Sequence, residues 1–266
     1  MQDRNSTPHE LQKVGGSTPD WLAEYGAEDR STDLLKQYRV IPRIKVIQSL
    51  SLESLKEEFG EGSAIVTPGN VLVAKRRESV EFVPLLFFPE WIKWADRDDK
   101  TGPPIIARTF DASSQIAKNA KDPKTRIEIY GTNLKARYVE HLNFVGLIRG
   151  AHELAGSLVV LSFSRGEHST GTSFISSISL RRVGGNKQAP LWSGVWKLTA
   201  NLRDRGTKKW WGMDYNPASE PWIKPEEAPV LRAMHEELLD QYQKQLLIVD
   251  QTTEDEVDDA PTSNKF

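Results

Sequence analysis

The chain has 266 residues, of which 38% are hydrophobic, and its formal net charge is −2. The mean hydropathy of −0.51 describes a polar chain that can still bury a core, and no apolar run reaches the roughly 18 residues that span a membrane. Cysteine is absent, which excludes disulfides, a thiolate nucleophile and a cysteine-based zinc site. The N-terminus lacks the layout of a signal peptide, so we expect a cytoplasmic protein with no membrane partner.

Charge is distributed unevenly along the chain. Residues 71–215 carry 23 Lys and Arg against 14 Asp and Glu, whereas residues 216–266 carry 4 against 12. The near-neutral total therefore conceals a basic centre between acidic ends. A basic groove attracts polyanions, and a tethered acidic arm can compete for it. The alternative is that the fold scatters these charges and forms no patch.

The first third of the chain is predicted to hold a lead, two short strand regions and a helix. Residues 1–37 are rich in Ser, Thr, Gly and Asp, and we expect a flexible lead there. Apolar alternation predicts a strand within 38–48, and helical spacing of leucines predicts a helix over 51–60. Residues 64–66 and 70–74 flank Thr67-Pro68-Gly69, which is typical of a hairpin.

The remainder is predicted to be mainly strands. Residues 79–88 are the most strand-like run, with Pro84 favouring an edge or a bulge. We expect a loop over 91–123 and strands over 126–130, 134–148 and 157–164. The segment at 172–183 suits a helix better than a strand. A long hairpin is expected from 191–202 and 210–215, followed by an amphipathic helix over 225–248.

This pattern predicts a mainly β (α+β) protein. Short strands with long charged loops favour an OB-like small barrel with a middle helix, a C-terminal helix and flexible acidic ends. The expected organisation is a lead (1–37), an OB-like nucleic-acid-binding domain (38–223), the C-terminal helix (224–249) and a disordered acidic tail (250–266). The missing βαβ alternation argues against a Rossmann or P-loop architecture.

Aromatic and basic residues are interleaved most densely in the predicted long hairpin. Single-stranded nucleic acid is bound by cations that follow its backbone and by aromatic faces that stack on bases, at about 1–3 kcal/mol per base. Trp210 and Trp211 point to opposite faces of a strand, so we expect one in the core and the other exposed. The alternative is that these aromatics only pack. The candidate nucleic-acid-binding residues of this hairpin are Trp196, Lys197, Arg203, Arg205, Lys208, Lys209, Trp210 and Trp211.

Three earlier clusters repeat the same interleaving of cations and aromatics. They lie at 75–82, 87–97 and 118–138, and each alone is a weak signal. Four such clusters in one domain favour nucleic-acid binding. The further candidate residues are Lys75, Arg76, Arg77, Trp91, Trp94, Lys124, Arg126 and Arg137.

The last 17 residues read DQTTEDEVDDAPTSNKF and contain six carboxylates, one lysine and a terminal Phe266. Such a segment cannot bury enough apolar surface to offset its ordering entropy, so we expect a mobile acidic arm. Phe266 offers an apolar anchor for a partner, although the segment could instead be a solubilising terminus. The candidate partner-binding residues are Asp255, Glu256, Asp258, Asp259 and Phe266.

Signals of an enzyme are poor. Nucleotide-binding, zinc-protease and serine-hydrolase motifs are absent, and no two of the five histidines are three or four positions apart. We therefore expect no catalytic residue, no cofactor and no metal. Asp98 and Asp99 before Lys100, and Asp122 before Lys124, loosely match the carboxylates and lysine of metal-dependent nucleases, which leaves that activity as an alternative.

Three segments together resemble a widespread family of phage and prophage proteins. They are IPRIKVIQ at 41–48, VEFVPLLFF at 80–88 with Trp91 and Trp94 after it, and SLVVLSFS at 157–164 before a predicted helix. The resemblance covers about residues 38–215 and implies single-stranded-DNA binding in a host cytoplasm.

The tail is similar to the acidic tails of phage and bacterial single-stranded-DNA-binding proteins. In those relatives the tail recruits replication partners and competes with DNA, and its acids adjoin the terminal Phe. Here residues 260–265 separate the carboxylates from Phe266, which weakens the case for docking but not for electrostatic competition.

The leading hypothesis is sequence-independent single-stranded-DNA binding in phage replication or recombination, with replication or recombination proteins as possible partners of the tail. A monomer or dimer is favoured. The alternatives are a ring-forming strand-annealing recombinase, a virion or assembly protein whose aromatics are core and interface, and the metal-dependent nuclease.

Overall fold

The computed structural model describes residues 40–96, 98–99, 101–150 and 152–249. The predicted lead (1–37) and the predicted acidic tail (250–266) lie outside these residues. The tail holds the candidate partner-binding residues, which therefore also lie outside them: Asp255, Glu256, Asp258, Asp259 and Phe266. None of the described helices is long and apolar enough to cross a membrane.

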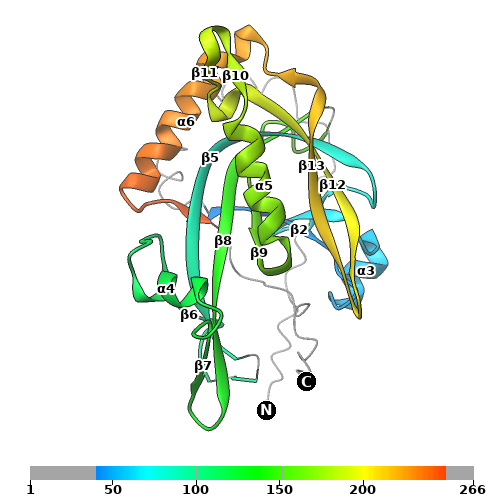
Figure 1. The fold of residues 1–266 in the computed structure, drawn as a ribbon. Coiled ribbons are helices and arrows are strands. Elements are labelled where there is room, and N and C mark those ends of the chain that lie inside the picture. The colour runs from blue at the N-terminus through cyan, green and yellow to red at the C-terminus, as the bar shows by residue number, and fades with distance from the viewer. Residues whose placement is uncertain (1–39, 97, 100, 151, 250–266) are drawn as a thin grey trace, which may run out of the picture. The chain divides into compact units, whose positions relative to one another are not determined.

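A ten-stranded, almost entirely antiparallel sheet dominates the fold, which is mixed α+β (Figure 1). Only β2 and β9 pair in parallel within it. β6 (Ile105–Thr109) adds to β5 and β7 (Ile127–Tyr130) adds to β8. The main path runs in the order β13 (Lys208–Trp222), β12 (Gly194–Arg205), β5 (Ser79–Trp94), β8 (Leu134–Arg149), β9 (Leu158–Ser164), β2 (Arg43–Val46), β3 (Ala64–Thr67) and β4 (Val71–Ala74).

Two smaller ladders and four α-helices complete the described residues. β1 (Val40–Ile41) pairs in parallel with β14 (Ile248–Val249), and β10 (Arg182–Val183) forms a hairpin with β11 (Lys187–Gln188). The helices are α3 (Glu53–Phe59), α4 (Gln115–Lys121), α5 (His168–Ser179) and α6 (Ala228–Gln243). A single 3₁₀ turn, η1 (Arg165–Glu167), joins β9 to α5.

Both faces of the sheet are buried, each under one of the longer helices. Phe144 and Val145 are neighbours in β8 and point to opposite faces, as strand geometry requires, and they belong to different core clusters. Phe174 of α5 packs into the cluster that contains Phe144, whereas Leu231 and Leu238 of α6 pack with Val145. The continuous apolar runs of β5, β8 and β9 follow from this two-sided burial.

Most of the predicted elements are confirmed. β1 and β2 lie within 38–48, α3 within 51–60, β3 and β4 flank the predicted turn, and β7, β8 and β9 occupy the three strand ranges. The ambiguous segment at 172–183 is largely helical, in α5, and α6 occupies the predicted C-terminal helix. β12 and β13 form the predicted long hairpin.

Pro84 marks a bulge and not an edge. The pairing of β5 with β8 shifts register between Pro84 and Leu86, although β5 is central, between β12 and β8. The missing N–H of proline is tolerated at such an irregularity. The carbonyl of Leu85, inside the bulge, accepts a hydrogen bond from Nδ1 of His235 at 2.6 Å, which ties α6 to the sheet.

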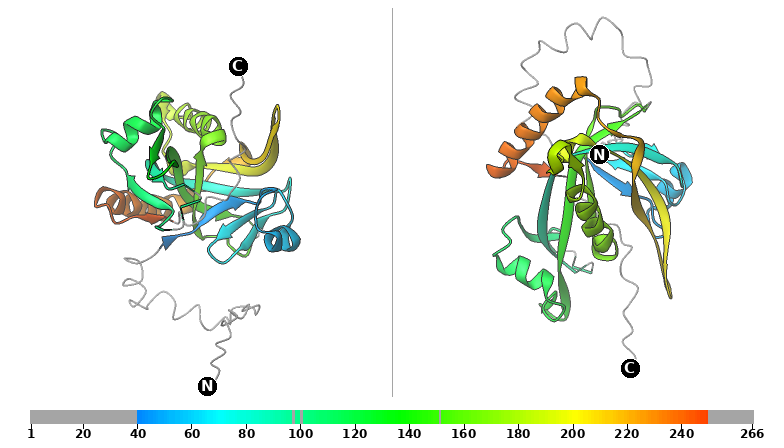
Figure 2. Two further views of the ribbon diagram at one scale, coloured as in Figure 1. Left: turned by 90° about the horizontal axis from the view of Figure 1, so that it is seen from below. Right: turned by 45° about the horizontal axis from the view of Figure 1, so that its top comes forward.

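Two predictions are wrong. The expected loop over 91–123 contains the end of β5, all of β6 and all of α4. In place of the expected OB-like small barrel, the described residues form an open sheet, because β13 and β4 end its path and do not pair with each other. Two long ladders extend from the centre of this sheet: the β5–β8 pair with β6, β7 and α4 at its end, and the β12–β13 hairpin beside α3 (Figures 1 and 2).

Candidate nucleic-acid interface

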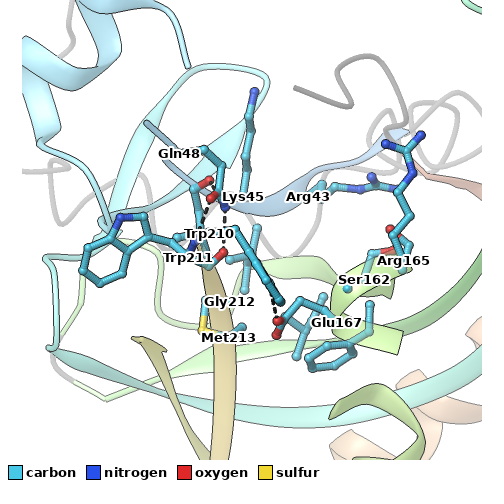
Figure 3. A pocket seen from close by; sticks show the side chains of 16 residues that line it. Arg43, Lys45, Gln48, Ser162, Arg165, Glu167, Trp210, Trp211, Gly212 and Met213 are labelled. Atoms are coloured by element: carbon cyan, nitrogen blue, oxygen red, sulfur yellow. Dashed lines mark hydrogen bonds between the residues drawn. The ribbon is translucent and has the colours of Figure 1, made fainter. Parts of the chain in front are cut away.

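A pocket lies where β13 faces β2 and β9 without pairing with them (Figure 3). We call it the seam pocket; residues of β2, of the end of β9, of η1 and of β13 line it. Arg43 and Lys45 of β2 alternate with Ile44 and Val46, so strand geometry puts the two cations on one face. Together with Arg165 they give the lining three cationic residues, while Trp210 and Trp211 contribute its β13 side.

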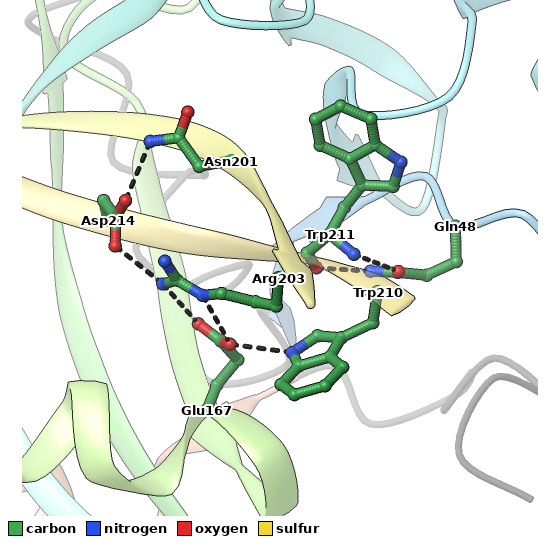
Figure 4. A network of polar contacts seen from close by, with 7 residues as sticks. All are labelled: Gln48, Glu167, Asn201, Arg203, Trp210, Trp211 and Asp214. Atoms are coloured by element: carbon green, nitrogen blue, oxygen red, sulfur yellow. Dashed lines mark hydrogen bonds and ion pairs between the residues drawn. The ribbon is translucent and has the colours of Figure 1, made fainter. Parts of the chain in front are cut away.

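Gln48 bridges the seam with its carboxamide (Figure 4). Its Nε2 donates to the backbone oxygen of Trp211 at 2.7 Å, and its Oε1 accepts from the backbone N–H of Trp211, also at 2.7 Å. One side-chain amide thus satisfies the donor and the acceptor that an adjacent strand would have satisfied. The edge of β13 is held near β2 although the two strands form no ladder.

Glu167 connects η1 to the β12–β13 hairpin through three donors (Figure 4). Nε and Nη2 of Arg203 each lie 3.1 Å from its carboxylate oxygens, and Nε1 of Trp210 donates to it at 2.8 Å. Nη2 of Arg203 also lies 2.6 Å from Oδ1 of Asp214. Hydrogen bonds to Glu167 raise the pKa of Arg203 above its ordinary value. Arg203, predicted as a phosphate contact, is therefore compensated by two carboxylates and holds the hairpin in place.

Trp211 is wedged between two segments that precede β5. A Cβ on Gly62, whose φ is +81°, would come within 2.7 Å of the indole Cε3. The guanidinium carbon of Arg76 lies 4.6 Å from the indole ring centroid. This stacking joins the turn between β4 and β5 to the hairpin, although the two are far apart in sequence.

Six of the predicted cations lie exposed on this turn and on the tip of the hairpin. We call them the hairpin patch: Lys75, Arg76, Arg77, Arg205, Lys208 and Lys209. Arg205 and Lys208 are directly paired across the two strands, and like charges in this position repel each other. Asp204 offsets only part of the charge, with its Oδ2 3.5 Å from Nζ of Lys209. The patch is therefore a surface on which a polyanion would relieve repulsion.

The other predicted cluster residues are placed at the far end of the β5–β8 ladder. Lys124 and Arg126 are exposed before β7, and Arg137 is paired with Trp94 and with Ile127 across β8. Trp91 donates from Nε1 to Glu140 at 3.1 Å. Lys124, Arg126, Arg137, Trp91 and Trp94 thus lie in or beside a second ladder, separate from the hairpin patch.

Glu140 anchors this second group. Nε2 of His168 lies 2.9 Å from its carboxylate, and this bond, opposed by partial burial, lowers the pKa of Glu140. Nζ of Lys121 lies 5.0 Å from the centroid of the Trp91 ring. The cluster joins α4 and α5 to β5 and β8.

Four of the five tryptophans among the candidate nucleic-acid-binding residues leave little ring surface open for base stacking. Trp91, Trp94, Trp196 and Trp211 are all buried, and Trp196 packs edge-on against Phe174 in the core. The alternative, that these aromatics only pack, agrees with the burial of these four residues. Trp211 is buried, as expected for one of that pair, whereas Trp210 is partly buried and not exposed as expected for the other. Lys197, next to Trp196, is also partly buried.

Several residues of the seam pocket and its surroundings lie outside the clusters that the sequence predicts. Arg43 and Lys45 could have been found, because they alternate with apolar residues in a predicted strand. Arg165 carries no pattern that could have singled it out; its φ is +47°, in the left-handed region. Among the tryptophans that the structure describes, Trp222 is the exposed one, with 41% of its surface accessible, and it lies outside the predicted cluster.

Two carboxylates of the nuclease alternative, Asp99 and Asp122, accept hydrogen bonds from residues two positions further along the chain. Asp99 accepts from the backbone and hydroxyl of Thr101, which lowers its pKa. Asp122 accepts from the backbone N–H of Lys124 at 2.9 Å. Within the part of the chain that the structure describes, no three His, Asp or Glu side chains are grouped so that they could hold a metal ion.

Comparison with known proteins places the chain in a family. No curated protein and no solved structure matches it. The family model described as "Pam3 phage gp34-like protein" matches residues 12–243, which is most of the chain. This agrees with the phage origin that the resemblance implied, and the description names no activity. The chain belongs to the Pam3 phage gp34-like protein family.

Proposed function

We propose that the protein binds single-stranded DNA without sequence preference, through the hairpin patch and the adjoining seam pocket. One observation carries the proposal: Arg76 stacks on Trp211 and so joins two basic segments from distant parts of the sequence. Cations of this kind follow a phosphate backbone. Arg43, Lys45 and Arg165 would continue the basic path into the seam pocket, where the partly buried Trp210 offers an aromatic edge.

The direct test is a titration with oligo(dT) at several salt concentrations, followed by fluorescence anisotropy. Each phosphate neutralised on a single strand contributes about −0.7 to the slope of log K against log salt. The double variant Lys208→Glu, Lys209→Glu should weaken binding at least tenfold at low salt and make that slope shallower by about 1.4.

Lys244→Glu is the control for one such charge reversal, because Lys244 is about as exposed as Lys209 and pairs with Asp240 on α6. It should leave both affinity and slope nearly unchanged. Binding that does not weaken with salt, or that weakens equally in the control, would contradict the proposed surface.

A second candidate is an assembly role in the virion, which the burial of four tryptophans favours. Ile127 and Ile129 of β7 are exposed by 51% and 66%, as in a strand that packs against another protein. This role predicts no binding of oligo(dT) even at low salt, so the same titration separates the two candidates.

A further inference from the structure

Trp222 ends the β12–β13 ladder at the opposite end from the hairpin patch. It pairs with Gly194, whereas Arg205 pairs with Lys208 at the tip. Eleven residue steps separate Gly194 from Arg205, which at about 3.4 Å per residue puts the two ends roughly 35 Å apart. With 41% of its surface accessible, Trp222 has a ring that a ligand can reach, unlike Trp196 and Trp211.

Arg181 stacks on one face of this ring. Its guanidinium carbon lies 3.9 Å from the ring centroid of Trp222 and 5.1 Å from that of the buried Trp196. Nη2 donates to the backbone oxygen of Pro221 at 2.5 Å. Because the guanidinium is held between the strand end and the core, the indole of Trp222 is fixed in orientation before any ligand arrives.

The charge of Arg181 has no carboxylate partner among the described residues. Its polar contact is to a carbonyl, and burial lowers its pKa. The next residue, Arg182, donates to the carbonyl oxygens of Ser179 and Arg181 and likewise forms no ion pair within that part of the chain. Lys187, across the β10–β11 hairpin from Val183, is exposed. Positive charge therefore accumulates beside an exposed indole.

We infer that Trp222 and Arg181 form a second nucleobase-stacking site, which engages the same single strand at a distance from the hairpin patch. A π-face backed by a guanidinium accepts any base, and Arg182 and Lys187 are available for neighbouring phosphates. This inference rests on the proposed function. The bound strand would run along the β12–β13 ladder, with the hairpin patch at one end and Trp222 at the other.

The test uses the dependence of affinity on oligonucleotide length in the full chain. Trp222→Ala should weaken binding of oligo(dT) of about 30 nucleotides by about 5- to 160-fold, the effect of losing one stacked base. It should change binding of about 6 nucleotides less than twofold, because a short strand occupies the hairpin patch alone. Trp222→Phe keeps a stacking face and should retain most of the affinity for the long strand.

Leu180→Ala is the control, since Leu180 is 72% exposed and adjoins Arg181 but has no aromatic ring; it should leave both affinities unchanged. If Trp222→Ala proves unstable by thermal unfolding, Arg182→Glu probes the same site by charge and should weaken only the long strand. If the wild-type chain binds neither length, the proposed function fails. If it binds both and Trp222→Ala binds the long strand normally, this inference alone is overturned.

Discussion

Glu167 of η1 is a side chain on which several polar contacts with the β12–β13 hairpin converge. It receives both Arg203 and Trp210, and it lies so close to Gly212 that a Cβ there would come within 2.3 Å of the carboxylate. A glycine at position 212 is therefore a requirement of this contact. Glu167 also bears on the hairpin patch. It holds Trp210, and the next residue, Trp211, stacks with Arg76 of that patch.

Replacing Glu167 with Ala should lower the free energy of unfolding by about 1–3 kcal/mol, because it removes charge-assisted hydrogen bonds from partly buried donors. Glu236→Ala is the control: that carboxylate pairs with Arg232 on the exposed face of α6, and such pairs contribute at most about 0.5 kcal/mol. Urea denaturation measures both. Equal losses in the two variants would show that the Glu167 network adds nothing beyond an ordinary surface pair.

At the scale of elements, the edge of β13 is held by a side chain where a strand is missing. Replacing Gln48 with Ala removes both bonds to the backbone of Trp211 and should speed amide hydrogen exchange at Trp211. The amides of β8 and β9, inside the sheet, should keep their protection. Ser49→Ala is a matched control, because Ser49 is exposed and its hydroxyl donates to Glu61. Unchanged exchange at Trp211 would mean that the packing of its ring against Gly62 and Arg76 is enough to hold the edge.

Most elements could be predicted from the sequence, because their signals are local. Alternation in β2, leucine spacing in α3 and the Thr67-Pro68-Gly69 turn each lie within about ten residues. The closure of the sheet is not local. Whether β13 meets another strand depends on the curl of the whole sheet, and the bonds of Gln48 to Trp211 join residues 163 positions apart. The predicted barrel was wrong for that reason.

The candidate site divides in the same way. Exposed cations were predictable, because Lys75, Arg77 and Lys208 lie in turns or beside them, where charged side chains face water. The exposure of each tryptophan was not predictable, since composition gives the number of aromatics but not which face of a strand is covered. Trp196 is covered by α5 through Phe174, whereas Trp222 stacks with Arg181 and stays 41% exposed.

At the scale of the whole molecule, the basic centre and the acidic end of the chain should act against each other. Residues 250–266 carry six carboxylates and one lysine, whereas the hairpin patch carries six exposed cations. An acidic segment tethered to the same chain raises the local concentration of competing negative charge at a polyanion-binding surface.

Deleting residues 250–266 should therefore tighten binding of oligo(dT) at low salt, and the gain should shrink as salt screens the competition. A full-length variant with all six carboxylates changed to Asn or Gln separates charge from length, since it keeps Phe266 and the size of the segment; the six are Asp250, Glu254, Asp255, Glu256, Asp258 and Asp259. If charge is the cause, this variant should bind as tightly as the deletion. Tighter binding in the deletion alone would assign the effect to Phe266 or to bulk, and no gain in either variant would show that the acidic segment does not compete for the hairpin patch.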